Sequence, residues 1–297
     1  MKAKYINPFT DFGFKKIFRE EASKYVLKDF LNSLLPEGNQ IANLTFKNTE
    51  QLGVNEPERK SIFDVYCENE KGEKFIVELQ KAKQNYFKDR TIFYSTFPIR
   101  EQAEQGEWNF NLKAVYCVGI LDFTFDDYEN EPERSEVVHT IKLKNQHGKV
   151  FYDKLTYIYL EMPNFTKDEL ELASRLDQWL YFIKNLEDFS VIPTLFKDEV
   201  FAKAFENAAL SKMDESEMMN YERSLKDYRD MKGYIDTARG EGVLEGREEG
   251  REEGKLEGKI EEKREIAKEL IKIGFDNDAI SKITKLNNEE IEKLRNE

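Results

Sequence analysis

Hydrophobic residues recur at helical spacing in the first 35 residues of the chain. Within residues 10–35 the apolar side chains lie three and four positions apart, and Pro36-Glu37-Gly38 follows them. This spacing is typical of one face of an α-helix, and proline and glycine end helices. We therefore predict a helix over 10–35 and a first strand within 41–54. The apolar positions of this helix are Phe14, Ile17, Phe18, Val26, Leu27, Phe30, Leu31 and Leu34.

A β-hairpin is predicted over residues 63–80. Two runs rich in β-branched and aromatic residues, IFDVYC and KFIVELQ, are separated by a polar stretch that contains Gly72. Such runs favour strands, and a polar segment with glycine favours the turn between them. Because side chains alternate along a strand, Glu78 and Gln80 share one face of the second arm, while Asp64 lies in the first arm.

The two carboxylates of this hairpin stand in apolar surroundings. Asp64 interrupts IFDVYC and Glu78 interrupts FIVEL, where the pattern predicts burial. A buried carboxylate needs a metal, a cation or several hydrogen-bond donors. Two acids brought together in this way can hold a divalent metal beside a phosphodiester. The alternative is a half-buried hairpin whose solvent face carries acids, which is common in antiparallel sheets.

Further elements continue a mixed pattern of helices and strands. Residues 84–105 are expected to be helical, with Pro98 as a kink or break. The apolar run 114–123 suits a strand covered on both faces. The segments 136–145 and 155–163 are expected to extend the sheet or to form another hairpin. The resulting order is helix, strand, hairpin, helix, strand.

Helices dominate after Lys167. We predict them over 168–186, 194–209 and 214–239. A charged tract then places glycine at every fourth position, at Gly242, Gly246, Gly250, Gly254 and Gly258. Each glycine inside a helix costs about 1 kcal/mol relative to alanine, so a flexible linker is one interpretation. The other, which we favour, is a helix whose glycine stripe lets a second copy of the chain approach closely.

Two short helices are expected after Gly274. Asp276 and Asn287 are suitable N-caps, and Asn287 with Glu290 has the spacing of a capping box. The pair of helices has the outline of a small helix-turn-helix that could read DNA. Because the surrounding sequence is acidic, we prefer a helical cap or a partner-binding end.

The net charge of −13 over 297 residues at first opposes binding to nucleic acid. Residues 1–165 contain 23 Lys and Arg against 26 Asp and Glu, whereas residues 166–297 contain 23 against 33, so most of the excess acid lies in the second half. The two cysteines, Cys67 and Cys117, are expected to be buried thiols, and too few cysteines and histidines are present for a structural zinc site. Without a signal core or a membrane span of roughly 20 apolar residues, we expect a cytoplasmic protein.

Several sequence blocks together resemble a known family. Asp64, the hairpin and Glu78-Leu79-Gln80 are similar to the PD-(D/E)XK nuclease signature, with Gln80 where lysine is usual. NPFTDFGFKKIF near the start, the segment from Arg90 to Tyr94, a glycine before the apolar strand and the glycine-glutamate tract add to the match. Together they resemble the Rpn family of recombination-promoting nucleases, also described as putative transposases. The resemblance covers most of the chain.

The resemblance implies a fold, an activity and a set of site residues. The fold is an α/β PD-(D/E)XK core, restriction-endonuclease-like, with an all-helical C-terminal extension. The activity is metal-dependent endonuclease cleavage of DNA in recombination or mobile-element biology, with Mg²⁺ or Mn²⁺ as cofactor. Asp64, Glu78 and Gln80 would be catalytic, and Asp64, Glu78 and the main-chain carbonyl of Leu79 would bind the metal. Residues expected near the metal or the phosphates are Asp11, Lys81, Lys83, Arg90 and Tyr94.

Some expectations remain open at this point. For Asp11, N-capping of the first helix is an equal alternative, and for Arg90 and Tyr94 the alternative is bracing of a helix on the sheet. We predict a nuclease domain over 1–165, a helical region over 166–239 and a glycine-rich end over 240–297. We also expect DNA as partner, no membrane and self-association through the C-terminal tract. The alternative function is a nuclease-fold protein with weak or no catalysis that binds DNA, proteins or copies of itself.

Overall fold

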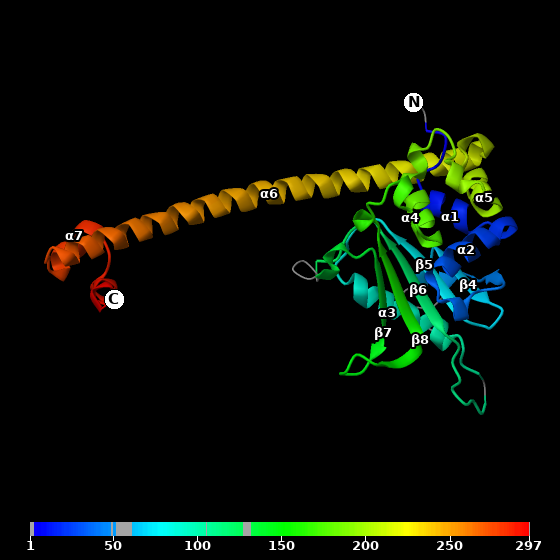
Figure 1. Ribbon diagram of the computed structural model, residues 1–297, viewed down its shortest axis with the longest axis horizontal. Coiled ribbons are helices and arrows are strands. Elements are labelled where there is room, and N and C mark those ends of the chain that lie inside the picture. The colour runs from blue at the N-terminus through cyan, green and yellow to red at the C-terminus, as the bar shows by residue number, and fades with distance from the viewer. Residues whose placement is uncertain (1–2, 49, 52–60, 105, 127–131, 297) are drawn as a thin grey trace. The chain divides into compact units, whose positions relative to one another are not determined.

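The computed structural model describes residues 3–48, 50–51, 61–104, 106–126 and 132–296 (Figure 1). The chain forms two compact units, Met1–Lys232 and Gly233–Glu297. Residue 49 and residues 52–54, within which part of the first strand was predicted, lie outside the described residues. The predicted division into three domains stays a prediction.

The first unit is built on a mixed six-stranded sheet with the order β1-β4-β5-β6-β8-β7 (Figure 1). Its strands are β1 (Leu44–Phe46), β4 (Val65–Asn69), β5 (Lys74–Gln80), β6 (Val115–Leu121), β7 (Val138–Lys144) and β8 (Val150–Glu161). A separate short pair joins β2 (Glu50–Gln51) to β3 (Ser61–Ile62). Strands β5, β6 and β8 run parallel, whereas β1, β4 and β7 each run antiparallel to a neighbour. The carboxyl ends of β5, β6 and β8 therefore meet at one edge of the sheet.

Helices cover both faces of this sheet. Helix α3 (Phe87–Arg100) lies over one face, and its Phe87 and Phe97 pack with Ile76 and Tyr159 of the strands. The helices that share a core with the opposite face are α1 (Asp11–Phe18), α2 (Lys24–Leu34), α4 (Arg175–Asn185) and α5 (Glu199–Ala208). Alternation along the strands produces both cores, and β6 is buried throughout, as its continuous apolar run predicts.

The prediction of one helix over 10–35 is wrong, because two helices occupy this segment. Helix α1 ends at Phe18, and α2 begins at Lys24 after a short 3-10 turn. The ring centroids of Phe18 and Phe30 are 5.3 Å apart. In one straight helix, twelve residues would separate them by about 18 Å along the axis. The break lets the two apolar faces pack against each other and against Trp179.

The other predicted elements of the first unit agree with the structure in type, helix or strand. The segments 136–145 and 155–163 form the β7–β8 hairpin, which extends the sheet. Helix α3 continues two residues past Pro98 before it ends at Arg100. Cys67 and Cys117 are buried free thiols. The short 3-10 helices are η1 (Glu21–Ser23), η2 (Glu37–Asn39), η3 (Pro132–Ser135), η4 (Met162–Asn164), η5 (Glu169–Glu171), η6 (Leu186–Asp188), η7 (Thr194–Phe196) and η8 (Leu210–Lys212).

Helix α6 (Glu215–Lys272) includes the whole glycine tract, so the linker interpretation of that tract is wrong. In the second unit, α6 is followed by α7 (Asn277–Thr284) and α8 (Asn288–Asn296), which pack around Ile280 and Ile291. Both predicted caps are present: Asp276 accepts from the Ala279 N–H at 2.8 Å, and Asn287 and Glu290 form a reciprocal capping box. No helix in the described part of the chain is long and apolar enough to cross a membrane.

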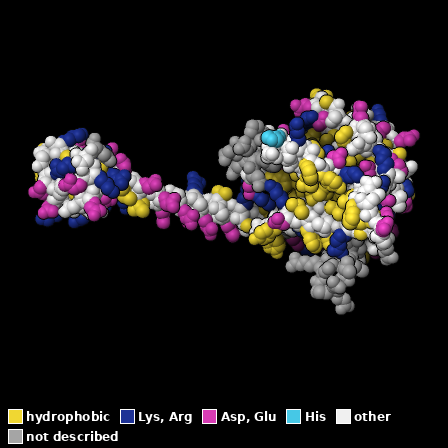
Figure 2. Space-filling model, turned by 90° about the horizontal axis from the view of Figure 1, so that it is seen from below, with side chains coloured by type: hydrophobic (Ala, Val, Ile, Leu, Met, Phe, Trp, Pro, Cys, Tyr) yellow, Lys and Arg dark blue, Asp and Glu magenta, His cyan; other side chains and the backbone are white. Residues whose placement is uncertain are grey.

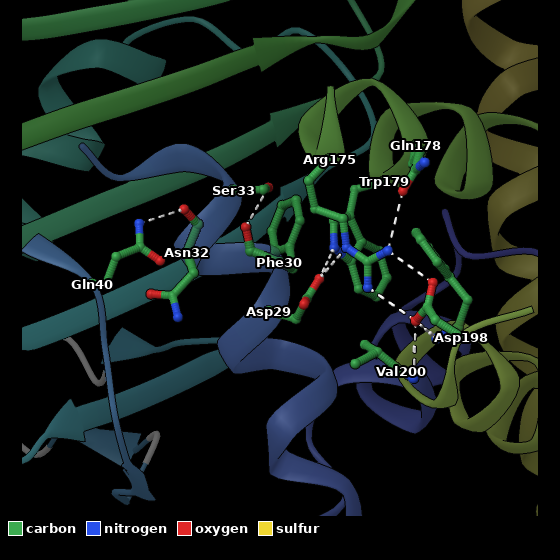
Figure 3. A network of polar contacts seen from close by, with 11 residues as sticks. Asp29, Phe30, Asn32, Ser33, Gln40, Arg175, Gln178, Trp179, Asp198 and Val200 are labelled. Carbon is green, nitrogen blue, oxygen red and sulfur yellow. Dashed lines mark hydrogen bonds and ion pairs between the residues drawn. The ribbon is translucent and has the colours of Figure 1, made fainter. Parts of the chain in front are cut away.

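A polar network connects three helices of the first unit (Figure 3). Asp29 of α2 accepts hydrogen bonds from Arg175 Nε and Trp179 Nε1 of α4, both at 2.7 Å. Arg175 also makes two hydrogen bonds to the Asp198 carboxylate at 2.9 and 3.0 Å, and its guanidinium lies 4.4 Å from the ring centroid of Phe201 in α5. These contacts fix α2 against α4 and α5, and α1 packs against α2 and α5.

We predict that Asp29→Ala destabilises the first unit by about 2–3 kcal/mol, because it leaves the buried indole N–H and the guanidinium without their shared acceptor. The measurement is urea unfolding followed by tryptophan fluorescence. Glu21→Ala, which removes only the exposed ion pair with Lys24, is the control and should change little. Equal unfolding midpoints for the two variants would contradict the structural role of this network.

Candidate active site

The register of the hairpin brings Asp64 and Glu78 to the same place. Val65 of β4 pairs with Val77 of β5 in antiparallel register. Asp64, one residue before Val65, therefore stands opposite Glu78, one residue after Val77. This position lies at the carboxyl end of β5, at the edge where β6 and β8 also end. In open α/β sheets this edge is the usual place for a binding site.

Main-chain and side-chain contacts fix Asp64. Its Oδ2 accepts a hydrogen bond from the Leu79 N–H at 2.8 Å, and its Oδ1 lies 3.4 Å from Lys15 Nζ of α1. Its side chain is 15% exposed. Burial raises the pKa of the Asp64 carboxyl, and the Leu79 N–H and Lys15 oppose this rise. The side chain of Leu79 is buried in the core on the α1 side, so only its main chain faces this site.

Glu78 lies on the α3 face of the sheet and is the less well satisfied of the two acids. Its Oε1 is enclosed and has no hydrogen-bond partner. It borders a cavity of about 20 Å³ whose other lining residues include Thr91, Tyr94 and Gly119. Burial and, secondarily, the negative charge of Asp64 raise the pKa of Glu78 to about 8. The negative charge of Asp64 thus acts on Glu78, and the positive charges of Lys15 and Arg90 only partly oppose the rise in its pKa.

Gln80 and Arg90 contact each other beside Glu78. Gln80, which is buried, accepts from Arg90 Nη2 through its Oε1 and donates from Nε2 to the Ala82 carbonyl at 2.8 Å. Arg90 lies one turn before Tyr94 on α3, and its guanidinium is 5.7 Å from the Tyr94 ring centroid. The rings of Tyr94 and Phe63 pack edge to face, with their centroids 5.5 Å apart. Both predicted α3 residues therefore lie at this end of β5.

The remaining predicted residues lie around this edge with other partners. Asp11 is the first residue of α1, but Thr10 is the N-cap, so the capping alternative for Asp11 is wrong. Asp11 instead pairs with Lys81 at 2.8 Å, and its charge acts to raise the pKa of Asp64. Lys83 pairs with Asp126 and is exposed, so nothing directs it toward the two acids.

Sequence reasoning missed Lys15 as a member of the site. It lies four residues after Asp11 on α1, which places both side chains on one face of the helix. Lys15 reaches Asp64, while Asp11 reaches Lys81 just after β5. The i,i+4 spacing within NPFTDFGFKKIF was the signal available for this residue.

The residues present fit a divalent cation. Two carboxylates and a main-chain carbonyl are hard oxygen ligands, which Mg²⁺ and Mn²⁺ accept, and Mg²⁺ usually keeps several waters as well. The unpartnered Glu78 Oε1 is an acceptor without a donor, as expected of a metal ligand. Among the residues that the structure describes, no cluster of three or more His, Cys, Asp or Glu side chains could hold a metal. A cation here would be bound by two carboxylates only, with the rest of its ligands from main chain, water or substrate.

The mixed sheet with its flanking helices is consistent with the α/β core of the PD-(D/E)XK nuclease class. The model of one family within this class, PD-(D/E)XK nuclease family transposase, matches residues 8–238. The chain belongs to this family. No curated protein and no solved structure matches the chain significantly. Family membership gives a nuclease-related function with DNA as the implied substrate, and nucleases of this class generally use divalent metals.

The raised pKa of Glu78 predicts a pH-dependent stability of the metal-free protein. A carboxyl whose pKa is higher in the folded than in the unfolded state loses stability as the pH rises above the unfolded value. Glu78→Gln removes this loss, so its melting temperature in EDTA should match wild type near pH 5 and exceed it by several degrees above pH 8. Thermal melts at several pH values test this. Glu104→Gln, at an exposed position, should follow wild type throughout, and a constant offset for Glu78→Gln would contradict the prediction.

Proposed function

We propose that this chain is a Mg²⁺- or Mn²⁺-dependent endodeoxyribonuclease of the cytoplasm that acts in DNA recombination or in the movement of mobile elements. The observation that carries the proposal is the position of Asp64 opposite Glu78 at the carboxyl end of β5, with Glu78 Oε1 unpartnered. Two converging acids with raised pKa values are typical of a functional site rather than of a structural ion pair. Family membership supports the same reaction class.

In this proposal Asp64, Glu78 and the Leu79 carbonyl hold the cation. When bound, a divalent cation activates water and stabilises negative charge on the attacked phosphate. The Leu79 N–H holds Asp64 in one orientation through Oδ2, and Oδ1, which lies 3.4 Å from Lys15 Nζ, is the oxygen that would bind the cation. Burial of Glu78 in an apolar setting strengthens its attraction for a cation, because the local dielectric constant is low.

Cationic side chains around the site support a polyanionic substrate. Lys15 pairs with Asp64, and Lys81, just after β5, pairs with Asp11, so each lysine is partnered by an aspartate in the metal-free protein. With the charge of Asp64 and Glu78 offset by a cation, these ammonium groups favour phosphate at the same edge. This local arrangement outweighs the net charge of −13, since the largest acidic excess lies after residue 165.

The test is nicking of supercoiled plasmid DNA by the purified full-length protein in Mg²⁺ or Mn²⁺. We predict activity in wild type and a loss of about a hundredfold or more in Asp64→Asn and Glu78→Gln, which remove one charge each. Asp64→Asn keeps an oxygen that can accept the Leu79 N–H, so the fold is preserved. Glu104→Gln should retain full activity.

Calorimetric titration with Mn²⁺ tests metal binding separately from DNA cleavage. Wild type should bind Mn²⁺, and both site variants should bind it more weakly. Equal inertness of wild type and both variants across divalent metals, with DNA binding intact, would contradict the nuclease function. That result would favour the alternative of a nuclease-fold protein that binds without cleaving.

We also propose that the C-terminal tract associates with a second copy of the chain. In the second unit, the glycine tract of α6 is exposed along its length, and Val243, Leu244 and Leu256 are 61–64% exposed. Acidic side chains are prominent along this part of the helix (magenta in Figure 2). Packing against another helix would offset the cost of the interior glycines.

Sedimentation equilibrium tests this association. We predict a dimer or higher oligomer for wild type and a monomer for Leu244→Glu/Leu256→Glu, which places charge among the exposed apolar positions. Glu252→Gln is a control on the same helix and should keep the wild-type mass. A monomeric wild type at all accessible concentrations would contradict the proposal.

A further inference from the structure

The hairpin motif Glu78-Leu79-Gln80 lacks a cationic side chain at its third position. The nuclease signature that it resembles usually has lysine there, whereas the amide of Gln80 carries no charge and serves only as donor and acceptor. A nuclease site benefits from a fixed positive charge where negative charge develops on the phosphate. Strand β5 therefore provides no positive charge at the third position of the motif, where the phosphate would need one.

The contacts of Gln80 leave it little freedom to orient a water molecule. Its side chain is buried, its Oε1 accepts from Arg90 Nη2, and its Nε2 donates to the Ala82 carbonyl at 2.8 Å. Both ends of the amide are thus engaged within the protein. The amide oxygen is directed at the guanidinium of α3, not at open solvent.

The guanidinium of Arg90 is held from several sides. Its Nη1 donates to Gln84 Oε1, and its Nη2 donates to Gln80. The rings of Phe87 and Tyr94 each lie 5.7 Å from it, close enough for cation–π attraction. Its Nε is enclosed and has no partner. A rigid planar cation therefore stands at the end of β5, where its charge also acts on Glu78.

We propose that Arg90 is the cationic catalytic group of this site, in place of a lysine on β5, and that Gln80 is a positioning residue that holds its guanidinium. The inference rests on the proposed nuclease function. A guanidinium remains protonated in proteins, so Arg90 cannot act as a general base. Its contribution is confined to binding oxygens of the scissile phosphate through the second N–H of each Nη, since Gln84 and Gln80 each use one.

The structural alternative is that Arg90 and Gln80 only tie α3 to β5. The two roles predict different results when the positive charge is moved from Arg90 on α3 to position 80 on β5. If the charge matters, a lysine on β5 can replace the arginine on α3 although the contact between the two elements is lost. If only the tie matters, the same double substitution remains defective and unstable.

The experiment compares Arg90→Gln, the double variant Gln80→Lys/Arg90→Gln, and Arg100→Gln. Arg100 is the matched control, since it is the last residue of α3 and its guanidinium lies 5.7 Å from the Phe97 ring centroid. We expect Arg90→Gln to lower the nicking rate about a hundredfold. The double variant should nick at least about tenfold faster than Arg90→Gln. Arg100→Gln should nick at the wild-type rate.

A second readout does not depend on cleavage. Affinity for a short DNA duplex is measured in Ca²⁺ at several salt concentrations by fluorescence anisotropy, together with thermal melts. Arg90→Gln should weaken binding and reduce the salt slope by about one, and the double variant should restore it. Melting temperatures should vary far less than the rates.

The outcomes separate this inference from the function on which it rests. An active wild type with Arg90→Gln equal to Arg100→Gln overturns the role of Arg90 and leaves the nuclease function standing. Failure of the double variant to recover rate and DNA affinity overturns it in favour of the structural tie. An inert wild type that binds no Mn²⁺ overturns the nuclease function and the inference together.

Discussion

The antiparallel register of β4 against β5 is the constraint on which the candidate site depends. The pairing of Val65 with Val77 places Asp64 opposite Glu78, and the Leu79 N–H then holds Asp64 at 2.8 Å. A slip of one residue would move every side chain of β5 to the other face, so Glu78 would enter the core on the α1 side. The cost of placing the polar side chains of Glu78 and Gln80 in that apolar core opposes the slip.

The helices supply the cationic side chains that the hairpin lacks beside its two acids. Helix α1 brings Lys15 to Asp64 and Asp11 to Lys81, while α3 brings Arg90 to Gln80 from the other face of the sheet. Helix α1 packs in turn on α2 and α5, which the network around Arg175 connects to α4. The positions of the cations are thus set by packing between helices that come from both ends of the first unit.

Local patterns were sufficient for the hairpin, β6, the β7–β8 pair and the C-terminal caps, because alternation, apolar runs and capping residues act over a few positions. They were insufficient where distant packing decides. The division between α1 and α2 depends on Phe18 meeting Phe30 and Trp179, and spacing alone favoured one helix. The pairing of Arg90 with Gln80 likewise depends on how α3 docks on β5. For the glycine tract, the low helix propensity of glycine disfavours the helix that the structure contains.

The central claim is that Asp64 and Glu78 together hold one divalent cation. Anomalous diffraction from crystals soaked in Mn²⁺ tests it most directly, because the scattering identifies the metal and its ligands without any assay of activity. We expect a peak between the two carboxylates, with the Leu79 carbonyl among the ligands of the metal. A peak elsewhere only, or none at saturating Mn²⁺ with both carboxylates well ordered, would contradict it.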